Sequence, residues 1–263
     1  MKAVLLTRKS PPQCYCANML FQSGIISSTV LDIPLSKKRT TTFCNAVLGY
    51  IVHPIVAIRK ARNVVFHERF FGDREYHNNR ILRHNYKTID PELAAVSFND
   101  INDEDCVSWI GQYKPDFVFV FGTCLIRRRL LEAFQCPVVN MHWGWSPDYR
   151  AEGIVSALAT GGSKDLGVTV HLLDISVDGG DILYQERIVI DIHDNFYSIG
   201  LKLALRGTEL FIRSYQNFEK DGSLAGMKQD TSRGKLYSGE FMRRHPQLYY
   251  QAWKNLSAEQ GRL

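Results

Sequence analysis

The sequence lacks the motifs and tracts that identify several common classes of protein. No GxGxxG pattern follows the first apolar run, so a dinucleotide-binding protein loses its main support. No Lys/Arg-rich tract with interleaved aromatic residues occurs, and the net charge of +5 permits an anionic small molecule without indicating nucleic acid. No apolar run is long enough to span a bilayer, and the apolar start at residues 1–6 lacks the order of a signal peptide. We therefore expect a cytoplasmic protein that binds neither membrane nor nucleic acid.

The cysteines are few and scattered. The six stand at Cys14, Cys16, Cys44, Cys106, Cys124 and Cys136, with no CxxC pair and no spacing to histidine that is typical of metal ligands. We predict free thiols, as in a reducing compartment, and no metal site.

Apolar runs alternate with segments of helical character along the chain. Residues 2–7, 27–34, 116–122 and 136–142 predict strands, and residues 11–24, 99–111, 125–134 and 152–160 predict helices. The strand, helix and strand over 116–142 have short connections, which predicts a parallel pair. Alternating segments at 167–174 and 181–190 predict an antiparallel pair, and a long helix is predicted from Asp194 to Asp221, before Gly222.

These elements predict an α/β fold: a mostly parallel sheet with helices on both faces and an antiparallel strand pair near the C-terminal end. We expect a catalytic domain over residues 1–220 and a C-terminal extension over 221–263 that packs on it and contains one short helix. Residues 41–74 are predicted to be largely helical, with a kink or break at Pro54.

Three polar residues stand at the predicted strand ends: Asn140, His142 and Asp178. In an extended segment residues i and i+2 face the same side, so Asn140 and His142 present an amide and an imidazole together. Each residue alone has an ordinary structural explanation, such as a turn for Asp178 before two glycines. Only the joint pattern favours a functional site.

The segments NMHWGWSPDYR, GVTVHLLD and SVDGGDILYQ follow one another in an order that resembles the formyltransferase family that uses 10-formyltetrahydrofolate. The resemblance is specific over about residues 115–190 and diffuse over the first 110. It implies a Rossmann-like formyltransferase fold, 10-formyltetrahydrofolate as the co-substrate, and Asn140, His142 and Asp178 as the catalytic residues.

The chemistry of formyl transfer suits these residue types. Transfer between two nitrogens passes through a tetrahedral carbon that bears an oxyanion, so the site needs donors for that oxygen and a group that takes the amine's proton. Asn140 and a protonated His142 supply donors, and a nearby carboxylate favours the imidazolium and helps to relay the proton. We interpret His171, in GVTVHLLD, as structural.

The resemblance also implies where the two substrates bind. The family places the pterin between two loops, which here contain Gly122, Thr123, Cys124, Leu125, Ile126, Leu173, Ile175 and Val177. Leu125 and Ile126 could equally be core residues at a helix start. The predicted acceptor-side residues are Trp143, Trp145, Tyr149 and Arg150, with at least one tryptophan expected to pack under its loop instead. Ala151 replaces a glycine that is frequent in the family, so we expect a different local turn.

The acceptor is predicted by elimination within the family. The purine-pathway enzyme has an N-terminal Gly-rich phosphate loop, and a deformylase typically starts with a regulatory domain. This chain shows neither feature. The residues after Asp221 are too few for the extra domain of the initiator-tRNA enzyme. The remaining branch acts on small amines, chiefly amino-sugar nucleotides and secondly hydroxyornithine-type amines. The basic segment 59–84 and the basic tail would suit a nucleotide diphosphate.

Three other questions stay open at this point. A hydrolase of 10-formyltetrahydrofolate would use the same three residues and release formate without an amine. A non-catalytic folate or nucleotide binder would bind tightly without turnover. The oligomeric state, a homodimer included, is also open.

Overall fold

The computed structural model describes residues 1–34 and 72–261. The predicted helix over 41–74 therefore lies outside the described residues except for its last three positions.

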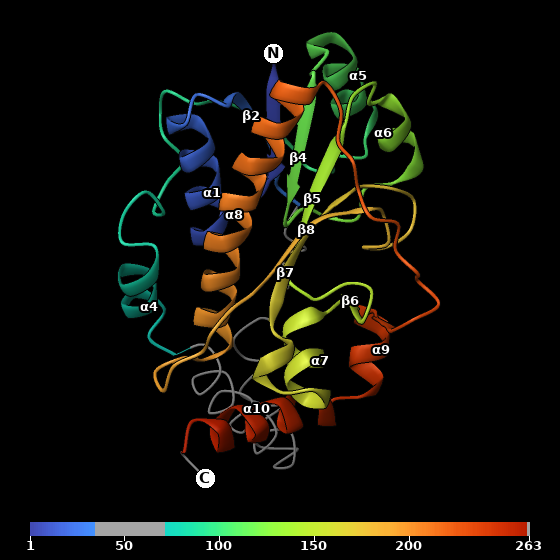
Figure 1. The fold of residues 1–263 in the computed structure, drawn as a ribbon. Helices are drawn as coiled ribbons and strands as arrows, with labels where there is room; N and C mark the ends of the chain where they lie inside the picture. Colours follow the sequence, from blue (N-terminus) through green and yellow to red (C-terminus); the bar gives the residue numbers. More distant parts are fainter. Residues whose placement is uncertain (35–71, 262–263) are drawn as a thin grey trace, which may run out of the picture.

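Seven strands of the described chain form one central sheet (Figure 1). They are β1 (Ala3–Thr7), β2 (Ile26–Asp32), β3 (Ala94–Phe98), β4 (Phe117–Phe121), β5 (Val138–His142), β7 (Gly167–Leu172) and β8 (Ile182–Arg187). Their order is β3-β2-β1-β4-β5-β7-β8. Along this order, each neighbouring pair among β3, β2, β1, β4 and β5 is parallel. Strand β7 is antiparallel to both of its neighbours, β5 and β8. The predicted mostly parallel sheet with an antiparallel pair is confirmed.

Helices cover both faces of this sheet, as predicted. On one face lie α1 (Pro11–Gln22) and the long α8 (Phe196–Asp221), with α4 (Arg74–Ile81) beside α8; on the other lie α5 (Glu104–Tyr113) and α6 (Arg128–Ala133). Leu5 and Phe119 belong to the core under α1 and α8, while their neighbours Val4 and Val118 belong to the core under α5 and α6. Burial on both faces explains why the β4 sequence FVFVF is continuously apolar.

The C-terminal segment packs at the lower end of the molecule in Figure 1. The short strand β6 (Tyr149–Ala151) pairs in parallel with β9 (Lys235–Tyr237), and α10 (Gln247–Glu259) packs along α7 (Gly153–Thr160). A 3₁₀ turn, η1 (Ser163–Asp165), follows α7. The helix predicted near the end of this tail forms as α10, and a second helix, α9 (Gly239–Arg244), was not predicted. Ser238 caps α9 by accepting the N–H of Phe241.

Two other predictions need correction. The edge strand β3 was not predicted, because AAVSF has neither strict alternation nor a continuous apolar run, and most of it is exposed. The long helix begins at Phe196, with Asn195 rather than Asp194 as its cap: Asn195 and Ser198 each bond the main-chain N–H of the other. Asp194 is instead fully buried, between Arg80 and Lys202.

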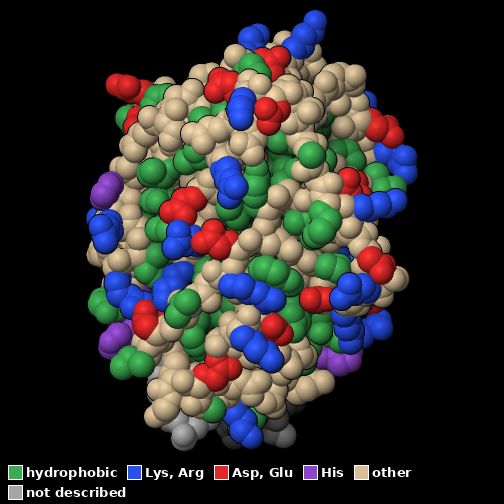
Figure 2. Space-filling view, viewed as in Figure 1, with side chains coloured by type: hydrophobic (Ala, Val, Ile, Leu, Met, Phe, Trp, Pro, Cys, Tyr) green, Lys and Arg blue, Asp and Glu red, His purple; other side chains and the backbone are tan. Residues whose placement is uncertain are grey.

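The surface and the cysteines add two observations. On the face in Figure 2, acidic, basic and apolar side chains are interspersed. The five cysteines within the described residues carry free thiols, and Cys44 lies outside them.

None of the helices in residues 1–34 and 72–261 has the length and apolarity needed to cross a membrane.

Candidate active site

The three predicted catalytic residues meet at the carboxyl end of β5. Asn140 and His142 lie on this strand two residues apart, and Asp178 lies in the turn between β7 and β8. Nδ2 of Asn140 is 3.4 Å from Oδ1 of Asp178, and Nδ1 of His142 is 3.3 Å from Oδ2 of the same carboxylate. One carboxylate therefore contacts both of the other residues, each through a different oxygen.

Asp178 is held from several directions. Its Oδ2 accepts the main-chain N–H of Ala151 over 2.9 Å, and its carbonyl oxygen accepts from the side chains of Ser146 (3.4 Å) and Gln229 (3.2 Å). Burial alone would raise the pKa of Asp178, but the positive charge of His142 and the hydrogen bonds to the carboxylate outweigh it and hold this pKa well below its usual range. The group is a firmly ionised carboxylate at neutral pH.

His142 is buried and has an oxygen next to each ring nitrogen. Nε2 lies 2.7 Å from the carbonyl oxygen of Tyr149, opposite the Nδ1 contact with Asp178. Both neighbours are acceptors, so an imidazolium that donates from both nitrogens satisfies both. Gly144 packs against this ring, because a Cβ there would lie 2.3 Å from Nε2 of His142. A side chain at position 144 would displace the imidazole.

His171, interpreted from the sequence as structural, contacts Asn140 in the structure. It lies fully buried on β7, directly opposite Asn140 in the antiparallel register. Its Nδ1 is 2.8 Å from the carbonyl oxygen of Leu172, so Nδ1 carries the proton and Nε2 accepts from Nδ2 of Asn140 over 3.0 Å. Nε2 is also 3.6 Å from Oδ1 of Asp178. The signal for this contact is the pairing of β5 with β7, which no short motif contains.

Ala151 keeps a glycine-like conformation. Its φ is 68°, in the left-handed region that glycine adopts without strain. The turn therefore keeps the geometry that glycine would favour, and the replacement leaves the main-chain N–H free to bond Asp178. The residue following the Tyr-Arg pair thus contacts the site through its backbone.

The two loops predicted to hold the pterin flank the end of β5. The first follows β4, and the N–H of Cys124 in it donates to Oδ2 of Asp32 over 2.7 Å. The second follows β7 and is joined to β5 by the bond from Leu173 N–H to the carbonyl of Val138, over 2.8 Å. Leu125 and Ile175 are 66% and 69% exposed, one in each loop. Exposed apolar side chains on facing loops suit a flat ring that would lie between them.

The other members of this predicted set lie in the same loops. Gly122 has a φ of 71° and sits against the side chain of Gln13, and the Thr123 hydroxyl donates to the Cys124 carbonyl over 2.8 Å. Ile126 packs partly buried against the core under α6, and Val177 is partly buried in the loop before Asp178. The helix predicted from 125 begins only at Arg128, so Leu125 is a loop residue and not a core residue.

The four predicted acceptor-side residues separate in the structure. Trp143 lines a cavity of about 570 Å³ between α1, α7 and α8, where its ring contacts Gly200. Trp145 is instead covered by the guanidinium of Arg187, 3.6 Å from the ring centre, and is not among the residues that line this cavity. Trp145 thus packs against Arg187 and Gly167 of the neighbouring strands.

Tyr149 and Arg150 use their side chains in packing. The Tyr149 hydroxyl donates to Oδ2 of Asp165 over 2.7 Å, and the Arg150 guanidinium donates to the carbonyl of Thr231 over 3.2 Å. The prediction that these two side chains bind the acceptor therefore finds no support in their positions. Tyr149 reaches the site by its carbonyl oxygen, which contacts His142.

The fold and the site define a class before any comparison: a doubly wound α/β protein with polar residues gathered at the carboxyl ends of its strands. The family model described as formyl transferase matches residues 72–214, more than half of the chain. The protein belongs to the formyl transferase family, whose members use 10-formyltetrahydrofolate, as the motifs predict.

Individual relatives are more distant. The methionyl-tRNA formyltransferase of Finegoldia magna is 28% identical over 130 residues, which is 49% of this chain and 42% of the relative. The chain thus spans less than half the length of the curated relatives it matches. A sugar N-formyltransferase from Shewanella has a similar structure, with a TM-score of 0.59 and 12% identity over 97% of this chain and 88% of its own. A 4-N formyltransferase from Francisella tularensis gives a TM-score of 0.57 and 14% identity over 97% and 87%. At these identities, the two structures support the fold alone.

Proposed function

We propose that the protein transfers a formyl group from 10-formyltetrahydrofolate to a primary amine. The observation that carries the proposal is the shared carboxylate of Asp178, with Asn140 on one oxygen and His142 on the other. This arrangement places two hydrogen-bond donors on one side of a fixed negative charge. Residues 122–126 and 173–177 would hold the folate, which supplies the formyl carbon.

The low pKa of Asp178 supports the first of its two expected roles, that of a fixed negative charge beside His142. A carboxylate that holds its proton so weakly is a poor base, so its first task would be to orient the ring of His142 and to place a negative charge beside it. His142 would then supply a donor to the developing oxyanion through Nε2, where the oxyanion would replace the carbonyl oxygen of Tyr149, while Nδ1 stays on Asp178. The proton of the attacking amine would leave through Asp178 or a water only after the amine has bonded to carbon and become acidic. Collapse of the tetrahedral carbon then breaks its bond to the folate nitrogen, which takes up a proton as tetrahydrofolate leaves.

Asn140 supplies the second donor through one of its two amide hydrogens. The 3.0 Å bond to His171 is short, whereas the 3.4 Å contact with Asp178 is long. The longer contact is the one that an oxyanion would replace. His171 would act as a positioning residue that keeps the amide group oriented while its other hydrogen turns to the substrate.

The acceptor that the chain favours is an amino-sugar nucleotide. The cavity beside Trp143 has about 570 Å³, within the range of small-ligand sites, and an indole can stack on a sugar or a base. Solved structures with this fold include sugar N-formyltransferases, whereas the curated sequence relatives are methionyl-tRNA formyltransferases. The product would be an N-formylated nucleotide sugar for surface polysaccharide, made in the cytoplasm.

The test is a panel of amines with the wild-type protein. 10-Formyltetrahydrofolate is incubated with amino-sugar nucleotides, hydroxyornithine-type amines, methionyl-tRNA and buffer alone, and the products are weighed by mass spectrometry. A formyl adduct on a sugar nucleotide, absent with Asp178→Asn, supports the proposal. An adduct only on methionyl-tRNA or ornithine would overturn the acceptor, and formate without any adduct would overturn the transfer.

A further inference from the structure

Two cavities meet beside the candidate active site. The first, of about 570 Å³, lies between α1, α7 and α8, and the second, of about 410 Å³, lies between α7, α9 and α10. They share the lining residues Ala151, Glu152 and Tyr249. The N–H of Ala151 donates to the carboxylate of Asp178. A residue in the wall shared by the two cavities therefore contacts the proposed catalytic carboxylate directly.

Glu152 places a carboxylate at the junction of the two cavities. Its Oε1 caps α7 by accepting the N–H of Val155 over 3.2 Å, and its own N–H donates to the carbonyl of Tyr237. Its carboxylate has no ion pair with the residues that the structure describes. Burial raises the pKa of Glu152, and the charge of His142 opposes this only in part. A buried carboxylate without a charged partner lowers the stability of the fold unless a bound ligand supplies that partner.

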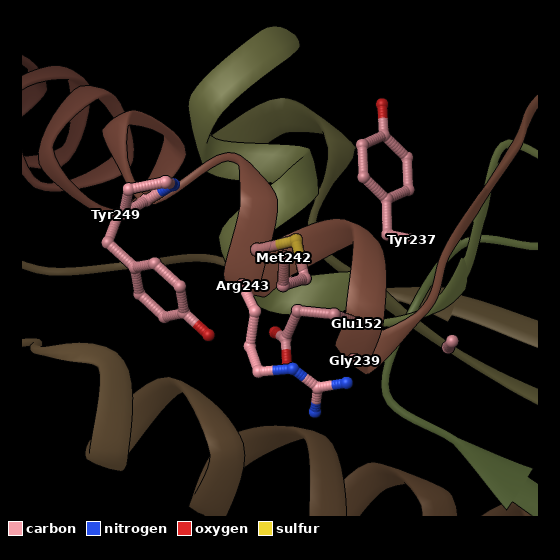
Figure 3. A pocket seen from close by; sticks show the side chains of 8 residues that line it. Glu152, Tyr237, Gly239, Met242, Arg243 and Tyr249 are labelled. Carbon is pink, nitrogen blue, oxygen red and sulfur yellow. The ribbon is translucent and has the colours of Figure 1, made fainter.

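Arg243 supplies the opposite charge across the second cavity. Figure 3 shows Arg243, Glu152 and Tyr249 pointing into one hollow from α9, α7 and α10. Within residues 1–34 and 72–261, the side chain of Arg243 makes neither an ion pair nor a hydrogen bond, whereas the adjacent Arg244 pairs with Glu240. The hollow thus offers a guanidinium and a carboxylate, and within the described residues neither forms an ion pair.

We propose that the joined cavities bind the formyl acceptor as a bipolar molecule, with Glu152 accepting hydrogen bonds from its amine-bearing end and Arg243 binding an anionic group that it carries. The inference rests on the proposed function and adds that the acceptor is an anionic amine. The carboxylate at position 152 recognises the donors beside the reacting nitrogen. The guanidinium, with five donors in a planar fork, suits a phosphate or a carboxylate. The residues after α8 would then select the acceptor, while Asn140, His142 and Asp178 perform the chemistry.

The test compares Glu152→Gln and Arg243→Gln with the matched control Arg244→Gln. The side-chain amide introduced by Glu152→Gln can still accept the N–H of Val155, so the α7 cap remains. Each of the first two variants is expected to raise the acceptor KM by roughly tenfold or more, with the KM for 10-formyltetrahydrofolate unchanged. The control is expected to leave both values unchanged. Unchanged acceptor KM in Glu152→Gln and Arg243→Gln, with an active wild type, would overturn the inference and leave the proposed function intact.

The nature of the anion is tested with three amines on the same variants. An amino-sugar nucleotide carries a diphosphate, a hydroxyornithine-type amine carries a carboxylate, and a free amino sugar carries neither. Arg243→Gln is expected to weaken only an anionic amine and so to remove the preference over the free amino sugar.

A last measurement separates failure of the inference from failure of the proposed function. If the wild type formylates no amine, the proposed function fails, and binding of the same three amines and of inorganic pyrophosphate is measured by calorimetry. Binding that is lost in Arg243→Gln and kept in Arg244→Gln supports the bipolar site, and no binding to the wild type overturns it.

Discussion

The main-chain N–H of Ala151 lies 2.9 Å from Oδ2 of Asp178, and both residues hold the left-handed backbone conformation, with φ values of 68° and 49°. A backbone donor on a β6 residue thus fixes the carboxylate that contacts both Asn140 and His142. The same turn leads directly into Glu152 and the two cavities that it lines. The proposed catalytic and recognition residues are therefore connected through two adjacent residues of the chain.

Replacement of Ala151 by glycine is expected to stabilise the protein. The left-handed conformation costs a residue with a Cβ roughly 1–2 kcal/mol. Glycine avoids this cost, but it also makes the unfolded chain more flexible, which offsets part of the gain in stability. We expect a net gain of about 1 kcal/mol in the free energy of unfolding, measured by denaturant titration, with turnover unchanged because the N–H remains. A loss of stability in Ala151→Gly would show that the turn does not strain the alanine.

His142→Ala and Asp178→Asn are expected to lower turnover by roughly two or more decades each, because each removes a charged group next to the developing oxyanion. Binding of the folate, measured by calorimetry, should be largely kept in both. Rates like the wild type in the two variants would mean that the motif was assigned the wrong role.

His171 is expected to act on turnover through Asn140. His171→Leu removes the acceptor of the 3.0 Å bond, which frees the amide to rotate, and we expect kcat to fall roughly 10²-fold while the KM values stay close to those of the wild type. His171→Gln, which keeps an acceptor oxygen, should recover part of the loss. The exposed His193→Leu is the control. Equal losses in the Leu and Gln variants would point to packing alone.

The stability contributed by the Asp178 carboxylate should depend on pH in a defined direction. Its pKa is depressed in the folded protein from an ordinary value of 3.8, so the contribution is complete above that value and is lost as the pH falls toward the lower folded pKa. The difference in unfolding free energy between wild type and Asp178→Asn should therefore be constant near neutrality and shrink below about pH 4. A difference that grows on acidification would contradict the paired carboxylate.

Glu152 should show the opposite sign. Burial raises its folded pKa above the ordinary value of 4.5, so the fold favours the neutral form and loses stability as the pH rises through the folded pKa. Glu152→Gln is expected to be more stable than the wild type at pH 7, and the gain should vanish as the pH falls below about 4.5. Thermal melts from pH 4 to 8 measure this. A less stable variant at pH 7 would show that the carboxylate is retained for packing.

The sheet core and the catalytic strand were predictable from local sequence. The run FVFVF is apolar at every position because β4 is covered on both faces, and the alternation in GVTVHLL matches an antiparallel strand. The i, i+2 rule places Asn140 and His142 on one side, and the structure brings both to Asp178. These features depend on periodicity or on residues close in sequence.

What sequence could not predict depends on contacts between distant segments. The place of His171 follows from the register of β7 against β5, and the packing of Trp145 follows from Arg187 on β8. Edge strand β3 carries little apolar signal because one neighbour is solvent. The proximity of Glu152 and Arg243 depends on how the last two helices pack against α7, which no local pattern contains.

The most direct test of the account is formyl transfer from 10-formyltetrahydrofolate to an anionic amine, measured by mass spectrometry with the wild type and with Asp178→Asn side by side. We expect a formyl adduct with the wild type and a yield roughly a hundredfold lower, or lower still, with the variant. An adduct that forms equally with both proteins, or formate release with no adduct on any amine, would contradict it.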